Sequence, residues 1–119
     1  RAEKYYLKLL ELDPEYGVAN GSYGYLLYLM GQYDKAMKYV KKQLELTRGK
    51  YIWGYFYLGL LHRVSGDNDK SEGCLMKAAK IMEGKALKTR KAIKRTVNVM
   101  KSNDESNHEY YDKFLRLSE

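Results

Sequence analysis

The chain has 119 residues, of which 45% are hydrophobic and 31% are charged, and its formal net charge is +7. This balance is typical of one folded domain with a moderate core and argues against a disordered chain. The longest apolar stretch, residues 52–61, is too short and too rich in tyrosine and glycine to cross a bilayer, so we expect no transmembrane segment. A single proline and apolar residues at helical spacing predict an all-α protein.

The first segment, residues 1–14, reads as one amphipathic helix followed by a turn at Pro14. It matches the second half of the unit that follows it, so it is predicted to be the second helix of a hairpin whose first helix is missing. Without a polar neighbour, Tyr5, Leu9 and Leu12 would leave apolar surface exposed, which repeat proteins normally avoid. Self-association through this N-terminal helix is therefore one hypothesis that the sequence suggests.

The next segment, residues 17–50, reads as two helices joined by a turn at Gly31, where glycine can adopt the left-handed conformation that ends a helix. Gly21 and Gly24 fall inside the first of these helices. A glycine there costs roughly 1 kcal/mol relative to alanine, so its presence predicts that another helix approaches closely.

The same pattern returns 35 residues later, where Gly59 and Gly66 take the places of Gly24 and Gly31. A period of about 34 to 36 residues is typical of stacked helical hairpins. Beyond them, residues 85–119 read as a basic helix, a set of polar capping residues and a last amphipathic helix. We expect this last helix to close the array. Its apolar residues are Tyr110, Tyr111, Phe114, Leu115 and Leu117.

These motifs resemble the tetratricopeptide repeat (TPR) family. Tyr55, Leu58, Gly59 and His62 follow the spacing of the family's W-x2-L-G-x2-Y motif, and Ala36 and Val40 follow that of A-x3-F. The resemblance implies an α-solenoid of antiparallel helical hairpins, wound as a right-handed superhelix in one domain. Its parts would be the second helix of a truncated first repeat (1–14), repeat 2 (17–50), repeat 3 (52–84) and a degenerate fourth repeat or capping helices (85–119).

In such a superhelix the first helix of each repeat lines a concave groove that binds partners. The residues at the matching positions are Ser22, Tyr25, Tyr28, Trp53, Phe56, Tyr57, Leu60 and Arg63. They lack the lysines and asparagines that the family's carboxylate clamp needs. We therefore expect a protein or peptide partner, either an apolar peptide or an amphipathic helix, rather than a terminal carboxylate.

The aromatic residues of this groove also have a plainer interpretation as core. Trp53, Phe56 and Tyr57, taken singly, are equally well explained as core residues packed against the helix that starts near Lys85. The whole stripe is harder to bury, and tyrosine and tryptophan dominate interface hot spots. We therefore expect a subset of the aromatic residues to remain available for a partner.

The positive charge is concentrated between residues 76 and 101, where nine lysines and arginines accompany one acidic residue, Glu83. A solvated helix face explains this charge, and the alternative is a binding surface for nucleic acid or another anionic partner. Sequence-specific nucleic-acid recognition has no support beyond the charge itself. A third alternative is a non-catalytic subunit of a larger assembly. The basic patch would consist of Lys88, Arg90, Lys91, Lys94 and Arg95.

No catalytic or metal-binding motif is present in the sequence. Cys74 is the single cysteine, and His62 and His108 lie far apart without a serine or cysteine placed to form a triad. We therefore predict a protein that is not an enzyme and has no catalytic residues, metal or cofactor. The lone cysteine favours a reducing compartment, and hence a cytoplasmic location.

Overall fold

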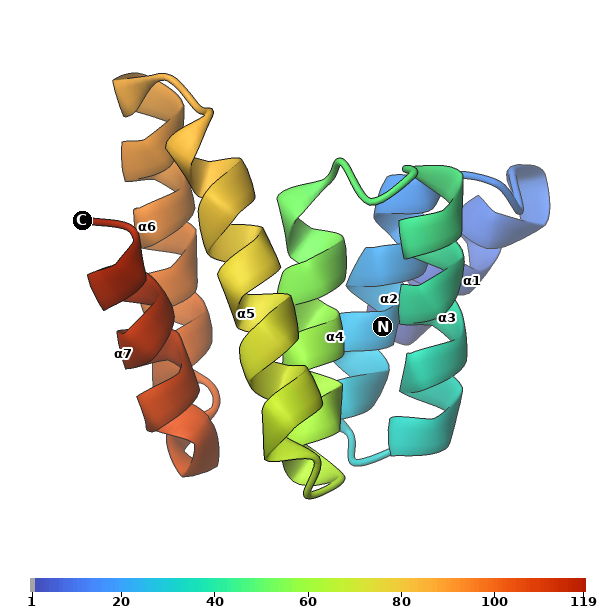
Figure 1. Cartoon of the computed structure of the whole chain (residues 1–119). Helices are drawn as coiled ribbons and strands as arrows, with labels where there is room; N and C mark the ends of the chain where they lie inside the picture. Colours follow the sequence, from blue (N-terminus) through green and yellow to red (C-terminus); the bar gives the residue numbers. More distant parts are fainter. Residues whose placement is uncertain (1) are drawn as a thin grey trace.

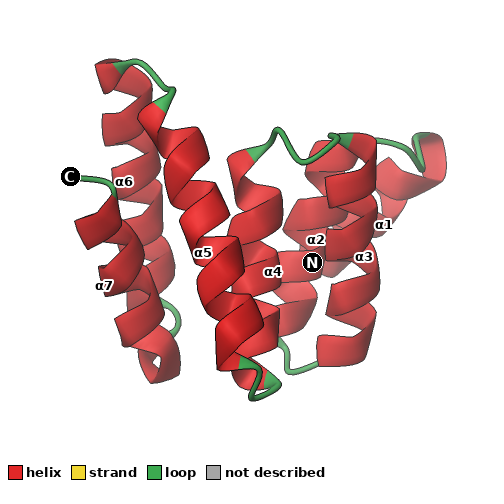
Figure 2. Cartoon of the chain, in the orientation of Figure 1, coloured by secondary structure: helices red, strands yellow, loops and turns green. Residues whose placement is uncertain are grey.

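The computed structural model describes residues 2–119, and helices are the regular elements found in that range (Figure 1, Figure 2). The helices α1 to α5 stack in chain order, each packing on the next, so the chain forms an all-α solenoid as predicted. Within residues 2–119, none of the helices is both long and apolar enough to cross a membrane. The elements are α1 (Ala2–Leu12), α2 (Gly17–Leu29), α3 (Tyr33–Leu46), α4 (Ile52–Val64), α5 (Asn68–Glu83), α6 (Leu87–Ser102), the 3-10 helix η1 (Glu105–Asn107) and α7 (His108–Leu117).

The helices α2 and α3 approach each other closely because α2 carries two glycines at their contact. A Cβ atom on Gly24 would lie 2.6 Å from Cγ2 of Val40, and one on Gly21 would lie 2.1 Å from the side-chain amide of Gln43. A side chain at either position would therefore force Val40 or Gln43 of α3 to move. The prediction that these glycines mark close helix packing is confirmed.

The predicted turn glycines also end their helices as expected. Gly31 has a φ of 80° and Gly66 a φ of 85°, both in the left-handed region that favours glycine. The amide of Gln32 donates to the carbonyl of Leu27 just beyond the first of them, which satisfies one of the free carbonyls at the end of α2.

The C-terminal hairpin, formed by α6, η1 and α7, departs from the regular stacking. In a regular array α6 would pack on α5 and α4. Instead α6 packs chiefly on α7 and η1, and α7 contacts α5 and reaches Phe56 of α4. Figure 1 shows α6 and α7 as a pair beside α5, joined to it by the loop that follows Glu83. The plainer interpretation, in which the helix near Lys85 covers the aromatic residues of α4, is therefore corrected for Phe56, because residues of α7 pack on its ring.

At the other end of the solenoid, α1 packs on α2 with one face only. Tyr6 and Leu10 lie against the core, and the hydroxyl of Tyr23 donates to Glu3 at 2.8 Å. Tyr5 and Leu12 are 61% and 77% exposed. The outer face of α1 thus exposes apolar side chains beside charged ones such as Lys4 and Lys8, and self-association through it stays a prediction.

Candidate functional site: the aromatic face of α2 and α4

Five aromatic side chains from α2 and α4 form one continuous surface, which we call the aromatic face. Because residues three or four apart share one side of a helix, Tyr25 and Tyr28 project together from α2, and Trp53, Phe56 and Tyr57 project together from α4. Four of the rings form a near-parallel stack across the two helices. Their centroids are 5.7 Å apart between Tyr28 and Tyr25, 5.1 Å between Tyr25 and Tyr57, and 6.0 Å between Tyr57 and Trp53.

One half of the aromatic face is covered by α7. The ring of Phe56 is fully buried, and its centroid lies 5.0 Å from that of Phe114 and 5.2 Å from that of Tyr110. The hydroxyl of Tyr110 donates to the backbone carbonyl of Phe56 at 2.7 Å. It passes over Gly59, where a Cβ atom would lie 2.1 Å from the hydroxyl oxygen. The glycine that sequence analysis placed at a helix contact thus admits a tyrosine of α7.

A carboxylate from the turn between α6 and η1 fixes the position of this hairpin. Asp104 accepts hydrogen bonds from the hydroxyl of Tyr28 at 2.5 Å and from that of Tyr111 at 2.8 Å. The hydroxyls of Tyr111 and Tyr25 are themselves 3.0 Å apart. Since each bond joins groups of fixed geometry, the cluster sets the position of α7 along the aromatic face.

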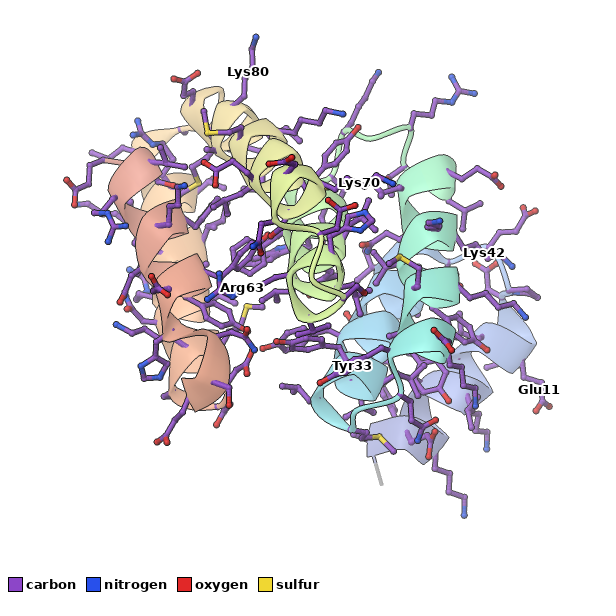
Figure 3. The ribbon with its side chains drawn as sticks, turned by 60° about the horizontal axis from the view of Figure 1, so that its bottom comes forward. Glu11, Tyr33, Lys42, Arg63, Lys70 and Lys80 are labelled. Carbon is purple, nitrogen blue, oxygen red and sulfur yellow. The ribbon has the colours of Figure 1, made fainter. Side chains whose placement is uncertain are left out.

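A second polar contact lies at the C-terminal end of α4. Arg63 extends from α4 toward α7 (Figure 3), and its Nε donates to Asn107 at 3.1 Å. Asn107 in turn donates to the hydroxyl of Tyr28 at 2.8 Å, and Arg63 also pairs with Glu109 at 3.5 Å. The turn between α6 and α7 is therefore bound to the ends of both α2 and α4.

The predicted groove residues separate into two groups. Tyr28, Phe56 and Leu60 are buried, which corrects the expectation that they line an open groove, and the guanidinium of Arg63 is engaged by the hairpin. Phe56 is buried against the rings of Tyr110 and Phe114 of α7, whereas Tyr28 bonds to Asp104 in the turn that precedes α7. The residues that stay partly exposed are Ser22, Tyr25, Trp53 and Tyr57.

Sequence analysis missed the residues of the hairpin that complete this site. Asp104 and Asn107 were interpreted only as capping residues, and Tyr110 only as part of an amphipathic end helix. The signal that could have identified them is complementarity: two apolar, tyrosine-rich surfaces in one small chain tend to bury each other.

Burial and the Asp104 carboxylate raise the pKa values of the tyrosines in this site. Burial raises the pKa of Tyr25 to about 12, and burial together with Asp104 raises those of Tyr28 and Tyr111 further. The native state therefore keeps protons that the unfolded state loses near pH 10. We expect these tyrosines to contribute their full stabilisation below about pH 10 and to lose it progressively at higher pH.

Absorbance at 295 nm measures this ionisation directly. In the native chain, a fraction of the thirteen tyrosines should remain protonated above pH 11 and ionise only as the helical circular-dichroism signal is lost. The same titration in guanidinium chloride is the control, because every tyrosine should then ionise near pH 10. Complete ionisation near pH 10 in a chain that stays helical would contradict the buried cluster.

The predicted basic patch is smaller in the structure than in the sequence. Lys88, Lys91 and Arg95 are exposed on α6, but Arg90 donates to the carbonyl of Ser118 at 3.1 Å and Lys94 is half-buried. The ion pairs among residues 2–119 do not involve the three exposed cations. The correction arises because Arg90 faces the end of α7 rather than solvent.

The residues with reactive side chains lie outside the aromatic face. Cys74 is buried in α5, and burial raises the pKa of its thiol, which favours the neutral form. Burial lowers the pKa of His62. Within residues 2–119, no three His, Cys, Asp or Glu side chains are grouped so that they could hold a metal ion.

The chain was compared with known protein families and with curated proteins. A family model described as tetratricopeptide repeat matches residues 5–38, which span most of α1, all of α2 and the start of α3. The matched segment therefore contains the α2 half of the aromatic face. No curated protein matches the chain.

Proposed function

Because this chain is a tetratricopeptide repeat protein, from a family whose repeats generally mediate protein–protein interactions, we propose that it binds a peptide or an amphipathic helix on its aromatic face. The observation that carries this proposal is that α7, an amphipathic helix, already lies on half of that face. A surface that holds one helix through aromatic packing and tyrosine hydrogen bonds suits another helix of the same character.

The partly exposed half of the face supports the same function. Tyr25, Trp53 and Tyr57 combine large contact areas with polar groups at their ends, which is the character of interface hot spots. In this proposal, residues 17–50 and 52–84 are the two repeats that build the surface, residues 1–14 are the second helix of a preceding repeat, and residues 85–119 are the closing helices. The family is typically non-catalytic, which agrees with a binding role.

A binding experiment with matched variants tests the proposal. The full chain is used as bait in a matching lysate, as wild type, as a Trp53→Ala and Tyr57→Ala double variant, and as a Met76→Ala control. Met76 is 48% exposed on α5, away from the aromatic face. We expect the double variant to lose its partner by roughly 30-fold or more in affinity, because hot-spot truncations cost at least about 2 kcal/mol.

The variants are first compared by circular dichroism, so that lost binding is not confused with lost folding. A partner that binds the folded double variant as well as it binds wild type would overturn the aromatic face as the binding surface. Loss of the partner from the Met76→Ala control would also overturn the aromatic face as the binding surface.

The exposed cations of α6 support one alternative, a binding surface for an anionic partner. Lys88, Lys91 and Arg95 have no carboxylate partner among residues 2–119, so their charge is free to attract one. Salt separates the two functions. Binding on the aromatic face should persist at about 0.5 M salt, whereas binding to phosphates should weaken by orders of magnitude.

A further inference from the structure

The C-terminal hairpin occupies the surface that the proposed function assigns to a partner. We propose that this hairpin is an internal ligand: it moves away as one unit and yields the aromatic face to a partner helix with the recognition chemistry of α7. That chemistry is an acidic side chain followed by two adjacent tyrosines and a phenylalanine, as in Asp104, Tyr110, Tyr111 and Phe114. The inference rests on the proposed function, because it names the kind of partner that the aromatic face selects.

The hairpin has internal contacts that would survive its movement. The side chains of Ile93, Val97 and Met100 are buried on α6, which packs chiefly on α7 and η1. Lys101 of α6 pairs with Asp112 of α7 at 2.5 Å. Because α6 is held mainly by α7, the two helices can leave the body of the protein together without losing their own packing.

The connection between the hairpin and α5 is suited to act as a hinge. Gly84, Lys85 and Ala86 are all exposed and lie between the end of α5 and the start of α6. No buried side chain anchors this segment, so the segment itself can change its backbone conformation without disturbing core residues of its own. In Figure 1 the loop lies at one end of the molecule, so that a rotation about it carries the whole hairpin.

The contacts between the hairpin and the body are of the kind that another helix can provide. Tyr110 and Phe114 pack on Phe56, and Asp104 accepts from Tyr28. An amphipathic helix with aromatic residues on one side and a carboxylate near its start could make each of these contacts. The aromatic face is thus specific for a pattern, which α7 displays, rather than for α7 itself.

Competition with the hairpin determines how such a partner binds. A ligand attached to its own site has an effective concentration on the order of millimolar, so a free helix competes poorly while the hairpin is intact. The apparent dissociation constant equals the intrinsic value divided by the fraction of chains that are open. A change that weakens the hairpin and leaves the aromatic face unaltered should therefore strengthen binding of a free helix.

The experiment uses a labelled peptide of residues 85–119, which is the hairpin itself, titrated by fluorescence anisotropy in about 0.3 M salt to suppress non-specific attraction. It is added to the full wild-type chain and to a full chain that carries Phe114→Ala, which loosens the hairpin only. We expect the peptide to bind the loosened chain at least about tenfold more tightly than the wild-type chain, because a larger fraction of the loosened chains has an open aromatic face. A peptide that itself carries Phe114→Ala is the matched control and should bind neither chain.

Equal affinity for the two chains, or equal binding of the control peptide, would overturn the inference. If the loosened chain does not fold, hydrogen exchange of the wild-type chain decides. The amides of α6 and α7 should then exchange together, and at least about tenfold faster than those of α4. Exchange at the same rate as in α4 would exclude a separate opening unit.

Two outcomes distinguish this inference from the proposed function and from another occupant. If the peptide behaves as expected but the Trp53→Ala and Tyr57→Ala variant keeps its partner, the hairpin opens and the proposed function is wrong. A concentration-dependent dimer by light scattering, in a chain whose exposed α1 residues are changed by Tyr5→Ser and Leu12→Ser, would overturn a partner helix in favour of hairpins exchanged between two copies.

Discussion

Replacing Phe56 with alanine should lower the free energy of unfolding by about 3–5 kcal/mol, the usual cost of truncating a fully buried phenylalanine. The ring is 0% exposed and contacts Tyr110, Tyr111 and Phe114 of α7. Its removal leaves a cavity between α4 and α7. Since a domain of this size is stable by about 5–15 kcal/mol, the loss is a large part of the total. Urea unfolding followed by circular dichroism measures it.

Trp53→Ala is the matched control for this substitution, because Trp53 is one helical turn away on the same face of α4 and is only half-buried. We expect it to cost less than Phe56→Ala although tryptophan is the larger residue. If Phe56→Ala leaves stability unchanged, Phe56 is not core, and the interpretation from sequence that it faces a partner would be restored.

Replacing Gly59 with alanine should also destabilise the protein, although alanine is the better helix former. A Cβ atom there would lie 2.1 Å from the hydroxyl oxygen of Tyr110 and 3.0 Å from its Cζ. Tyr110 is buried and bonded to the carbonyl of Phe56, so its ring has little freedom to move. Overpacking of this kind costs about 1–3 kcal/mol, against a gain of about 1 kcal/mol in helix propensity, and we expect a net loss of up to about 2 kcal/mol.

Two comparisons make this result specific. Gly73→Ala, also within a helix but with nothing within 4 Å of the added atom, should raise the free energy of unfolding by about 0.5–1 kcal/mol. Adding Tyr110→Phe to Gly59→Ala removes the clashing oxygen and should recover part of the loss, as a double-mutant cycle would detect. Stabilisation by Gly59→Ala alone would mean that Tyr110 does not lie over Gly59.

The sequence predicted the helices and turns of the solenoid well because local signals encode them. The first helices of the predicted segments 17–50 and 52–84 are found at Gly17–Leu29 and Ile52–Val64. Gly31 and Gly66 end helices because their positive φ values favour glycine whatever surrounds them. Helical periodicity and the left-handed conformation are properties of short segments, so they can be recognised without knowledge of the fold.

The candidate site was predicted in part. The residues of the aromatic face were predicted from the groove positions that the tetratricopeptide repeat resemblance implies, and helical spacing places them on one side of each helix. The sequence did not predict which helix covers Phe56, because α6 and α7 are both amphipathic and the sequence alone does not show which of them fits that surface better. Asp104 shows the same limit: its neighbours Tyr28 and Tyr111 are distant in sequence and meet it only through folding.

The sequence by itself determined that this protein is an all-α repeat solenoid, because periodicity and turn chemistry act over a few residues, and the family resemblance added the aromatic surface on α2 and α4. Only the tertiary structure decided that α7 rather than α6 covers half of that surface, and that Asp104 holds the hairpin in place. The physical reason is that burial and hydrogen bonding between distant segments depend on shape complementarity, which exists only once the helices are arranged in space.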